Sequence, residues 1–268
     1  MFFKRKNQNQ TTGTTATTNT TTTARRYITP GNVAVYVPFL EMVKNDHLMI
    51  AGCTGSGKSV ALNGIIVSLL MKYSPYEAQF IFIDPKKVEL FQYENIPHCI
   101  KYADNSKDFQ LALKMAEIEM DRRFAIMKTR KEKEFSGSTL YVVIDELSDL
   151  MTTNKKECFS SLVRLAQVGR AAKIRLIACT QNLLAKIIPT EFKVNFPVVL
   201  GLRTATKQQS TFLIHSPGLE NLPNPRTAGK GCGIIRDGSD LFPVEIYMYP
   251  EQVVKSILNH WTTNKCIA

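Results

Sequence analysis

The sequence lacks the features that mark disulfide-linked, zinc-binding and membrane-spanning chains. Its six cysteines show no C-x-x-C spacing, so they indicate reduced thiols rather than a disulfide framework or a zinc site. The four histidines are scattered and indicate no metal site. No apolar run reaches the roughly 18 residues of a membrane span, and no apolar stretch follows Met1 to Lys4 as it would in a signal peptide. These absences predict a cytoplasmic protein that reaches a membrane only through a partner.

Acidic residues are absent from the first 30 residues. The basic residues of this segment are Lys4, Arg5, Lys6, Arg25 and Arg26. The net charge of the whole chain is +11, so these five leave +6 on the remainder. An excess of positive charge suits binding to the phosphate backbone of a nucleic acid, although many basic proteins bind none.

Residues 11–23 consist of threonine with a few glycine, alanine and asparagine residues. Such a segment has little to bury and predicts a flexible tether. We therefore expect residues 1–29 to form a disordered basic tail and residues 30–268 to form one α/β domain. The length of 268 residues is sufficient for that arrangement. The basic tip either contacts DNA or anionic lipid, or has no binding role.

Residues 52–59 form a complete G-x-x-x-x-G-K-[ST] phosphate loop, preceded by an apolar run typical of a buried strand and followed by one typical of a helix. Glycines let the backbone wrap closely around phosphates, and the loop N–H groups and helix dipole face the anion. Lys58 is expected to reach the β- and γ-phosphates of ATP, and the Ser59 hydroxyl to ligate Mg²⁺. The candidate nucleotide-binding residues are Gly52, Cys53, Thr54, Gly55, Ser56, Gly57, Lys58, Ser59 and Val60.

Two further expected strands end in polar residues. Leu140–Ile144 is followed by Asp145 and Glu146, and Ile174–Cys179 is followed by Thr180 and Gln181. We expect Asp145 to hold Mg²⁺, and Glu146 to polarise the attacking water. Gln181 is a candidate sensor of the γ-phosphate. An Asp-Glu pair favours ATP hydrolysis over nucleotide binding alone.

Strands alternate with helices along the chain, which predicts a mostly parallel sheet with helices on both faces. In such sheets the ligand lies beyond the carboxyl ends of the strands, where the candidate residues would meet. Further expected strands are Asn32–Val37 (ended by Pro38), Gln79–Asp84, Val198–Leu202, Gly229–Ile235 and Phe242–Tyr247, and further helices are Ser106–Arg130, Glu157–Ala172 and Glu251–Trp261.

Several motifs in unbroken order resemble the motor domain of FtsK/SpoIIIE-type DNA translocases, over roughly residues 30–250. They are Asp46–Gly52, Phe80–Leu90, Ile96–His98, Glu119–Phe124, Val143–Leu150, Arg164–Gln167, Gly169–Ala172 and Cys179–Gln181. The resemblance implies a RecA-like ATPase that assembles as a hexameric ring and pumps double-stranded DNA through its pore.

The chain departs from that family at two places. Asn182-Leu183 follows the Thr-Gln pair where the family usually has Arg-Pro. The Ser-Arg pair that often supplies an arginine to the neighbouring subunit lines up near Ser210-Thr211. Candidates for the missing arginine are Arg170 and Arg203, then Arg226 or Lys230. For Arg170, a structural role in pairing with a carboxylate is an equal alternative.

The resemblance implies an ATP-driven double-stranded DNA translocase with a transfer, segregation or packaging partner. The small size favours a mobile-element, plasmid or virus version. The basic end of the expected long helix (Lys128, Arg130, Lys131 and Lys133) resembles a DNA-facing loop, although charged helix ends are usually solvated. Two alternatives stay open: a conjugation coupling protein acting on single-stranded DNA, and a non-motor module whose nucleotide switches its affinity for DNA or a partner.

Overall fold

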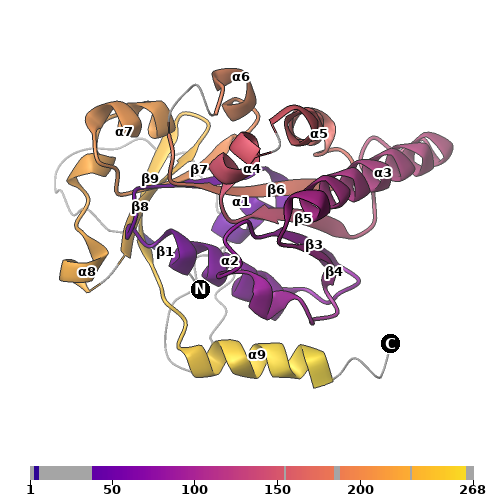
Figure 1. The fold of residues 1–268 in the computed structure, drawn as a ribbon, viewed down its shortest axis with the longest axis horizontal. Coiled ribbons are helices and arrows are strands. Elements are labelled where there is room, and N and C mark those ends of the chain that lie inside the picture. Colours follow the sequence, from indigo (N-terminus) through magenta and orange to yellow (C-terminus); the bar gives the residue numbers. More distant parts are fainter. Residues whose placement is uncertain (1–2, 6–37, 154, 184–187, 230, 264–268) are drawn as a thin grey trace, which may run out of the picture.

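The computed structural model describes residues 3–5, 38–153, 155–183, 188–229 and 231–263 (Figure 1). These residues form a nine-stranded sheet with the order β1-β9-β8-β7-β2-β6-β5-β3-β4. Strands β2 to β7 pair in parallel, whereas β8, β9 and β1 are antiparallel. The strands are β1 Phe3–Arg5, β2 Leu48–Ala51, β3 Ala78–Ile83, β4 Cys99–Ala103, β5 Thr139–Ile144, β6 Ile174–Thr180, β7 Val198–Leu202, β8 Gly231–Asp237 and β9 Asp240–Ile246.

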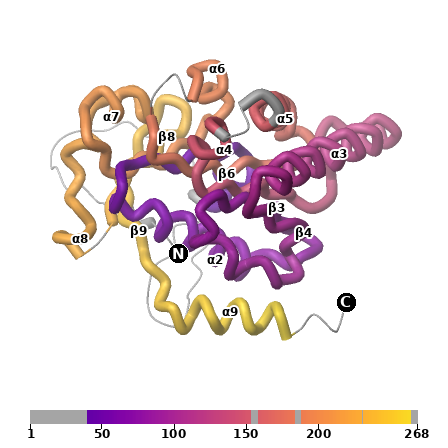
Figure 2. Tube along the Cα trace, viewed as in Figure 1, coloured from indigo at the N-terminus to yellow at the C-terminus, as the bar shows by residue number. Residues whose placement is uncertain are grey.

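Helices cover both faces of this sheet, so its central strands are buried on both sides and consist mostly of apolar residues. Helices α2 and α9 lie over one face, and α3, α4 and α5 lie over the other (Figures 1 and 2). The helices are α1 Pro38–Asn45, α2 Lys58–Lys72, α3 Ser106–Arg130, α4 Leu147–Thr153, α5 Lys155–Val168, α6 Thr190–Lys193, α7 Lys207–Ile214, α8 Pro225–Ala228 and α9 Glu251–Thr263.

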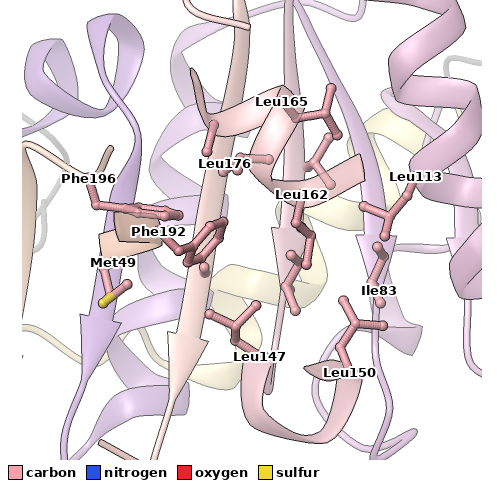
Figure 3. Close-up of a cluster of buried hydrophobic side chains, with 14 of the residues drawn as sticks. Met49, Ile83, Leu113, Leu147, Leu150, Leu162, Leu165, Leu176, Phe192 and Phe196 are labelled. Atoms are coloured by element: carbon pink, nitrogen blue, oxygen red, sulfur yellow. The ribbon is translucent and has the colours of Figure 1, made fainter. Parts of the chain in front are cut away.

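Each face has its own buried apolar cluster. On the α3–α5 face, Leu113 of α3 and Leu162 of α5 belong to one buried cluster with Ile83 and Leu176 of the sheet (Figure 3). On the other face, the apolar side of α2 packs against the sheet, and Trp261 of α9 donates a hydrogen bond to the Leu70 carbonyl at 3.1 Å. This two-sided packing confirms the α/β class expected from the sequence.

Helix α3 has the bounds that its sequence predicts. The Asn105 side chain caps its first turn by accepting a hydrogen bond from the Asp108 N–H, and Lys131 ends it in the left-handed conformation at a φ of 56°. The fully buried Arg123 donates to the carbonyl oxygens of Ser138, Ala172 and Lys173. This arginine therefore ties α3 to the amino-terminal side of β5 and β6.

Other expectations need correction. The strand expected at Asn32–Val37 lies outside the described residues, and Pro38, which was expected to follow it, is the first residue of α1. The helix expected at Glu157–Ala172 runs from Lys155 to Val168. The edge strands β1 and β4 were not predicted. Strand β1 lies within the segment that was expected to be a disordered tail. Residues 6–29 of that segment lie outside the described part of the chain. Among the described residues, no helix combines the length and apolarity needed to cross a membrane.

Candidate nucleotide-binding site

The phosphate loop connects β2 to α2 at the carboxyl edge of the sheet. Gly57 is the N-cap of α2 with a φ of 94°, and Gly55 has a φ of 77°, which are backbone conformations that other residues rarely adopt. A Cβ on Gly52 would stand only 2.7 Å from Cβ of Leu202 in β7. All three glycines of residues 52–59 are thus required by turn geometry or by close packing.

Neighbouring strands hold this loop in place. The Cys53 N–H donates to the Arg203 carbonyl at 2.9 Å, and the Gly52 N–H donates to the Thr180 carbonyl at 3.4 Å. The loop opens into a cavity of about 350 Å³. This cavity is lined by Cys53, Thr54, Gly55, Gly57, Lys58, Ser59, Val60, Gln181, Pro225 and Arg226.

Four groups contact the carboxylate of Glu146. Its Oε2 lies 3.1 Å from Nζ of Lys86 and 3.9 Å from Nζ of Lys58. Its Oε1 accepts hydrogen bonds from the Ser148 hydroxyl at 2.8 Å and from the Gln181 N–H at 3.2 Å. Burial alone would raise the pKa of Glu146, but Lys58, the Ser148 hydrogen bond and Lys86 outweigh burial and hold it below its usual value. The carboxylate is therefore ionised and fixed in orientation.

Asp145 has a different environment. Its side chain is 2% exposed, and its Oδ1 has no hydrogen-bond partner among the described residues. Burial raises the pKa of Asp145 to about 6, against the opposing effect of the Lys58 ammonium. An orphaned, buried carboxylate oxygen in a residue whose carbonyl contacts Lys58 of the phosphate loop fits Mg²⁺, which prefers such oxygen ligands. Asp145 and Ser59 are the residues that would hold this ion.

Gln181 joins the phosphate loop to Glu146. The Thr54 hydroxyl donates to Oε1 of Gln181 at 2.8 Å, while the Gln181 backbone N–H binds Glu146. Lys58, 6% exposed, directs its Nζ to the Asp145 carbonyl at 3.4 Å. The structure thus brings together the four residues Lys58, Asp145, Glu146 and Gln181, which lie on three separate motifs in the sequence.

The candidate arginines lie in three different places. Arg170 precedes β6 at the amino edge of the sheet, away from the phosphate loop of its own chain, and forms an ion pair with Asp46 at 2.7 Å. Arg203 follows β7 at the carboxyl edge, where its carbonyl oxygen accepts from Cys53. Arg226 lines the nucleotide cavity itself. Lys230 lies outside the described residues.

Two residues of the site were not assigned from the sequence. Lys86, which contacts Glu146, and Asp84, which is buried beside Asp145, belong to the Asp84-Pro85-Lys86-Lys87 turn after β3. Asp84 Oδ2 accepts from the Glu89 and Leu90 N–H groups, whereas its Oδ1 has no partner among the described residues. Their position directly after a buried strand, the same signal that indicated Asp145, could have identified them.

This fold and site define a RecA-like P-loop ATPase. The model of the FtsK/SpoIIIE family matches residues 33–139. DNA translocase FtsK of Oceanobacillus iheyensis is 37% identical over 202 residues, which cover 68% of this chain and 26% of that protein. DNA translocase SpoIIIE of Bacillus subtilis is 34% identical over 211 residues, 71% of this chain and 27% of that protein. The chain belongs to the FtsK/SpoIIIE family.

A solved structure gives the same result for the fold. The pCW3 conjugation coupling protein TcpA, as a monomer with ATPγS, matches with a TM-score of 0.68 and 25% sequence identity. The match covers 86% of this chain and 68% of that chain. The chain therefore spans about a quarter of the length of the two translocases and two thirds of the solved coupling protein.

Proposed function

We propose that the chain is an ATP-driven motor that translocates double-stranded DNA as a homo-oligomeric, hexameric ring. The observation that carries the proposal is the convergence of the phosphate loop, Asp145, Glu146 and Gln181 at one edge of the sheet. A buried carboxylate held by four partners beside a phosphate loop suits hydrolysis, because the base keeps one orientation towards the attacking water. The similarity to two DNA translocases supports DNA as the track.

In this mechanism the loop N–H groups and Lys58 bind the phosphates of ATP. Glu146 orients a water molecule and accepts its proton as that water attacks the γ-phosphorus, while the bond from the γ-phosphorus to the β,γ-bridging oxygen breaks and ADP leaves. Gln181 senses the γ-phosphate. When bound, Mg²⁺ supplies charge neutralisation at the β- and γ-phosphates. Gln181 contacts both the loop and Glu146, so it is placed to relay the nucleotide state to the base. A ring would place ATP between adjacent subunits.

The basic end of α3 is the proposed DNA contact. Lys128, Arg130, Lys131 and Lys133 are all exposed, and α3 extends past the sheet (Figure 1). Lysine and arginine side chains on such a projection bind phosphates without reading bases. We therefore infer sequence-independent and salt-sensitive DNA binding.

The test is ATP hydrolysis by the purified protein, alone and with linear double-stranded or single-stranded DNA at two salt concentrations. Strong stimulation by duplex DNA, abolished in Glu146→Gln, supports the translocase. Stimulation by neither DNA would contradict it and favour a nucleotide-switched binding module. Triplex displacement would then separate DNA movement from DNA-stimulated hydrolysis.

A second candidate function has one specific observation in its favour. The solved structure of the pCW3 conjugation coupling protein TcpA matches most of this chain. We infer as the alternative a coupling protein that moves single-stranded DNA in conjugation. Greater stimulation by single-stranded than by duplex DNA would select this alternative. We infer that either motor acts in the cytoplasm and requires a partner for transfer, segregation or packaging, including one anchored at a membrane.

A further inference from the structure

The short helix α8 places an arginine directly on the phosphate loop. The position that a Cβ would occupy on Gly55 lies 3.2 Å from Nε of Arg226 and 3.4 Å from its Cζ and Nη2. Gly55 has a φ of 77° and no side chain, so the guanidinium can approach the loop backbone closely. Pro225 and Arg226 line the same cavity as Lys58.

Local contacts fix the position of this arginine on α8. The Asn224 side chain accepts a hydrogen bond from the Arg226 N–H at 3.1 Å, and Pro225 occupies the first turn, where its missing N–H costs nothing. Gly229 ends the helix in the left-handed conformation at a φ of 68°. One capped turn, leading into the neighbouring β8, thus holds the backbone of Arg226 in a defined place.

Within the described part of the chain, no carboxylate forms an ion pair with Arg226. The ion pairs between described residues include Arg164 with Asp121 and Arg170 with Asp46, but none of them includes Arg226. Its side chain is exposed at the mouth of the cavity. A guanidinium presents a planar set of donors that matches a phosphate group and binds it in a bidentate manner.

We propose that Arg226 binds the terminal phosphate of ATP in cis, from the same chain as the phosphate loop. Gly55 follows Thr54, whose hydroxyl donates to Gln181, the expected sensor of the γ-phosphate. Arg226, which contacts the loop at Gly55, therefore lies at the end of the loop where the γ-phosphate would bind. The proposal rests on the nucleotide site of the proposed function and is independent of DNA translocation. It also changes the assignment expected from the sequence, where Arg226 was a candidate to act on a neighbouring subunit.

The test compares the dissociation constants for ATPγS and ADP in the absence of DNA, for the wild type and Arg226→Ala. We expect Arg226→Ala to weaken ATPγS binding about tenfold or more and ADP binding about threefold or less, because only ATPγS has a γ-phosphate. Arg226→Lys should recover part of the difference, since it keeps the charge but not the fork. Thr227→Ala, an exposed neighbour on α8, is the matched control and should bind both nucleotides as the wild type does.

The outcomes separate this proposal from the proposed function. Unchanged ATPγS binding by Arg226→Ala, or an equal loss for ATPγS and ADP, overturns the role of Arg226 alone. Failure of the wild type to bind ATPγS overturns the nucleotide site as well. If DNA does not stimulate ATP hydrolysis, the proposal of a DNA translocase is wrong, whereas the proposed role of Arg226 still stands.

Mixing Lys58→Ala with Arg226→Ala, at an ATP concentration too low to saturate Arg226→Ala, distinguishes action in cis from action in trans. Lys58→Ala lacks a working loop but retains Arg226, and Arg226→Ala retains the loop. If Arg226 acted on a neighbour, mixed oligomers would contain complete sites and regain ATP hydrolysis. We expect the mixture to hydrolyse ATP no faster than the two variants measured separately, and a faster rate would overturn the cis assignment.

Discussion

We expect the imidazole of His47 to make the stability of the fold dependent on pH. It is fully buried at the start of β2, where its Nδ1 accepts a hydrogen bond from the Leu176 N–H at 2.9 Å. Its Nε2 must then carry the proton and donate to the Ala166 carbonyl at 3.1 Å. Protonation of Nδ1 would remove the acceptor for Leu176 and place a charge in the core, so acidification is expected to destabilise the fold.

The size of this loss of stability follows from the pKa of His47. Burial, followed by the charges of Arg175 and Arg170, lowers the pKa of His47 from 6.5 to about 3. Below pH 6.5 the unfolded chain therefore binds a proton that the folded chain does not, and stability falls as pH falls through this range. The loss is about 1.4 kcal/mol per pH unit, or about 2 kcal/mol between pH 7.5 and pH 5.

Urea unfolding at pH 7.5 and pH 5 measures this loss, and His47→Gln provides the control. Glutamine can donate to Ala166 but does not titrate, so the variant should be less stable at pH 7.5 and lose about 2 kcal/mol less on acidification than the wild type. The difference between the two proteins removes the contributions of other titrating groups. Equal losses in both proteins would refute a buried neutral imidazole.

The remaining predictions concern the proposed motor. Glu146→Gln should bind ATPγS normally but lose about 100-fold or more in turnover, because it cannot accept a proton; full turnover would exclude Glu146 as the base. Lys58→Ala should lose nucleotide affinity in an equilibrium binding assay, and undiminished binding would contradict the assigned phosphate loop. Lys86→Met should reduce kcat about tenfold at unchanged ATPγS affinity, because Glu146 loses the ammonium group 3.1 Å from its Oε2; a wild-type kcat would remove Lys86 from the mechanism. Replacing Lys131 and Lys133 with alanine should weaken duplex binding at all sequences and lower the dependence of log K on log salt by about 2, and an unchanged slope would place the DNA contact elsewhere.

The sequence by itself determined the elements whose signals are local. The phosphate loop is encoded by its glycines and by the strand and helix that flank it, and α3 by its Asn105 cap and apolar spacing. Asp145 and Glu146 were identifiable because a buried parallel strand is a continuous apolar run that ends at the edge where ligands bind. The parallel α/β class follows from the same alternation of strands and helices.

Only the tertiary structure decided which distant residues meet at that edge. The order of strands in the sheet sets whether Lys86 reaches Glu146 and whether Arg226 reaches Gly55, and no local pattern encodes that order. The edge strands β1 and β4 were missed for a related reason. Each is stabilised by pairing with one neighbour, β9 or β3, and β4 is only partly buried, so its apolar pattern is weak. Contacts between segments far apart in the chain depend on how the sheet assembles, and this is why the partners of the nucleotide site became visible only in the folded protein.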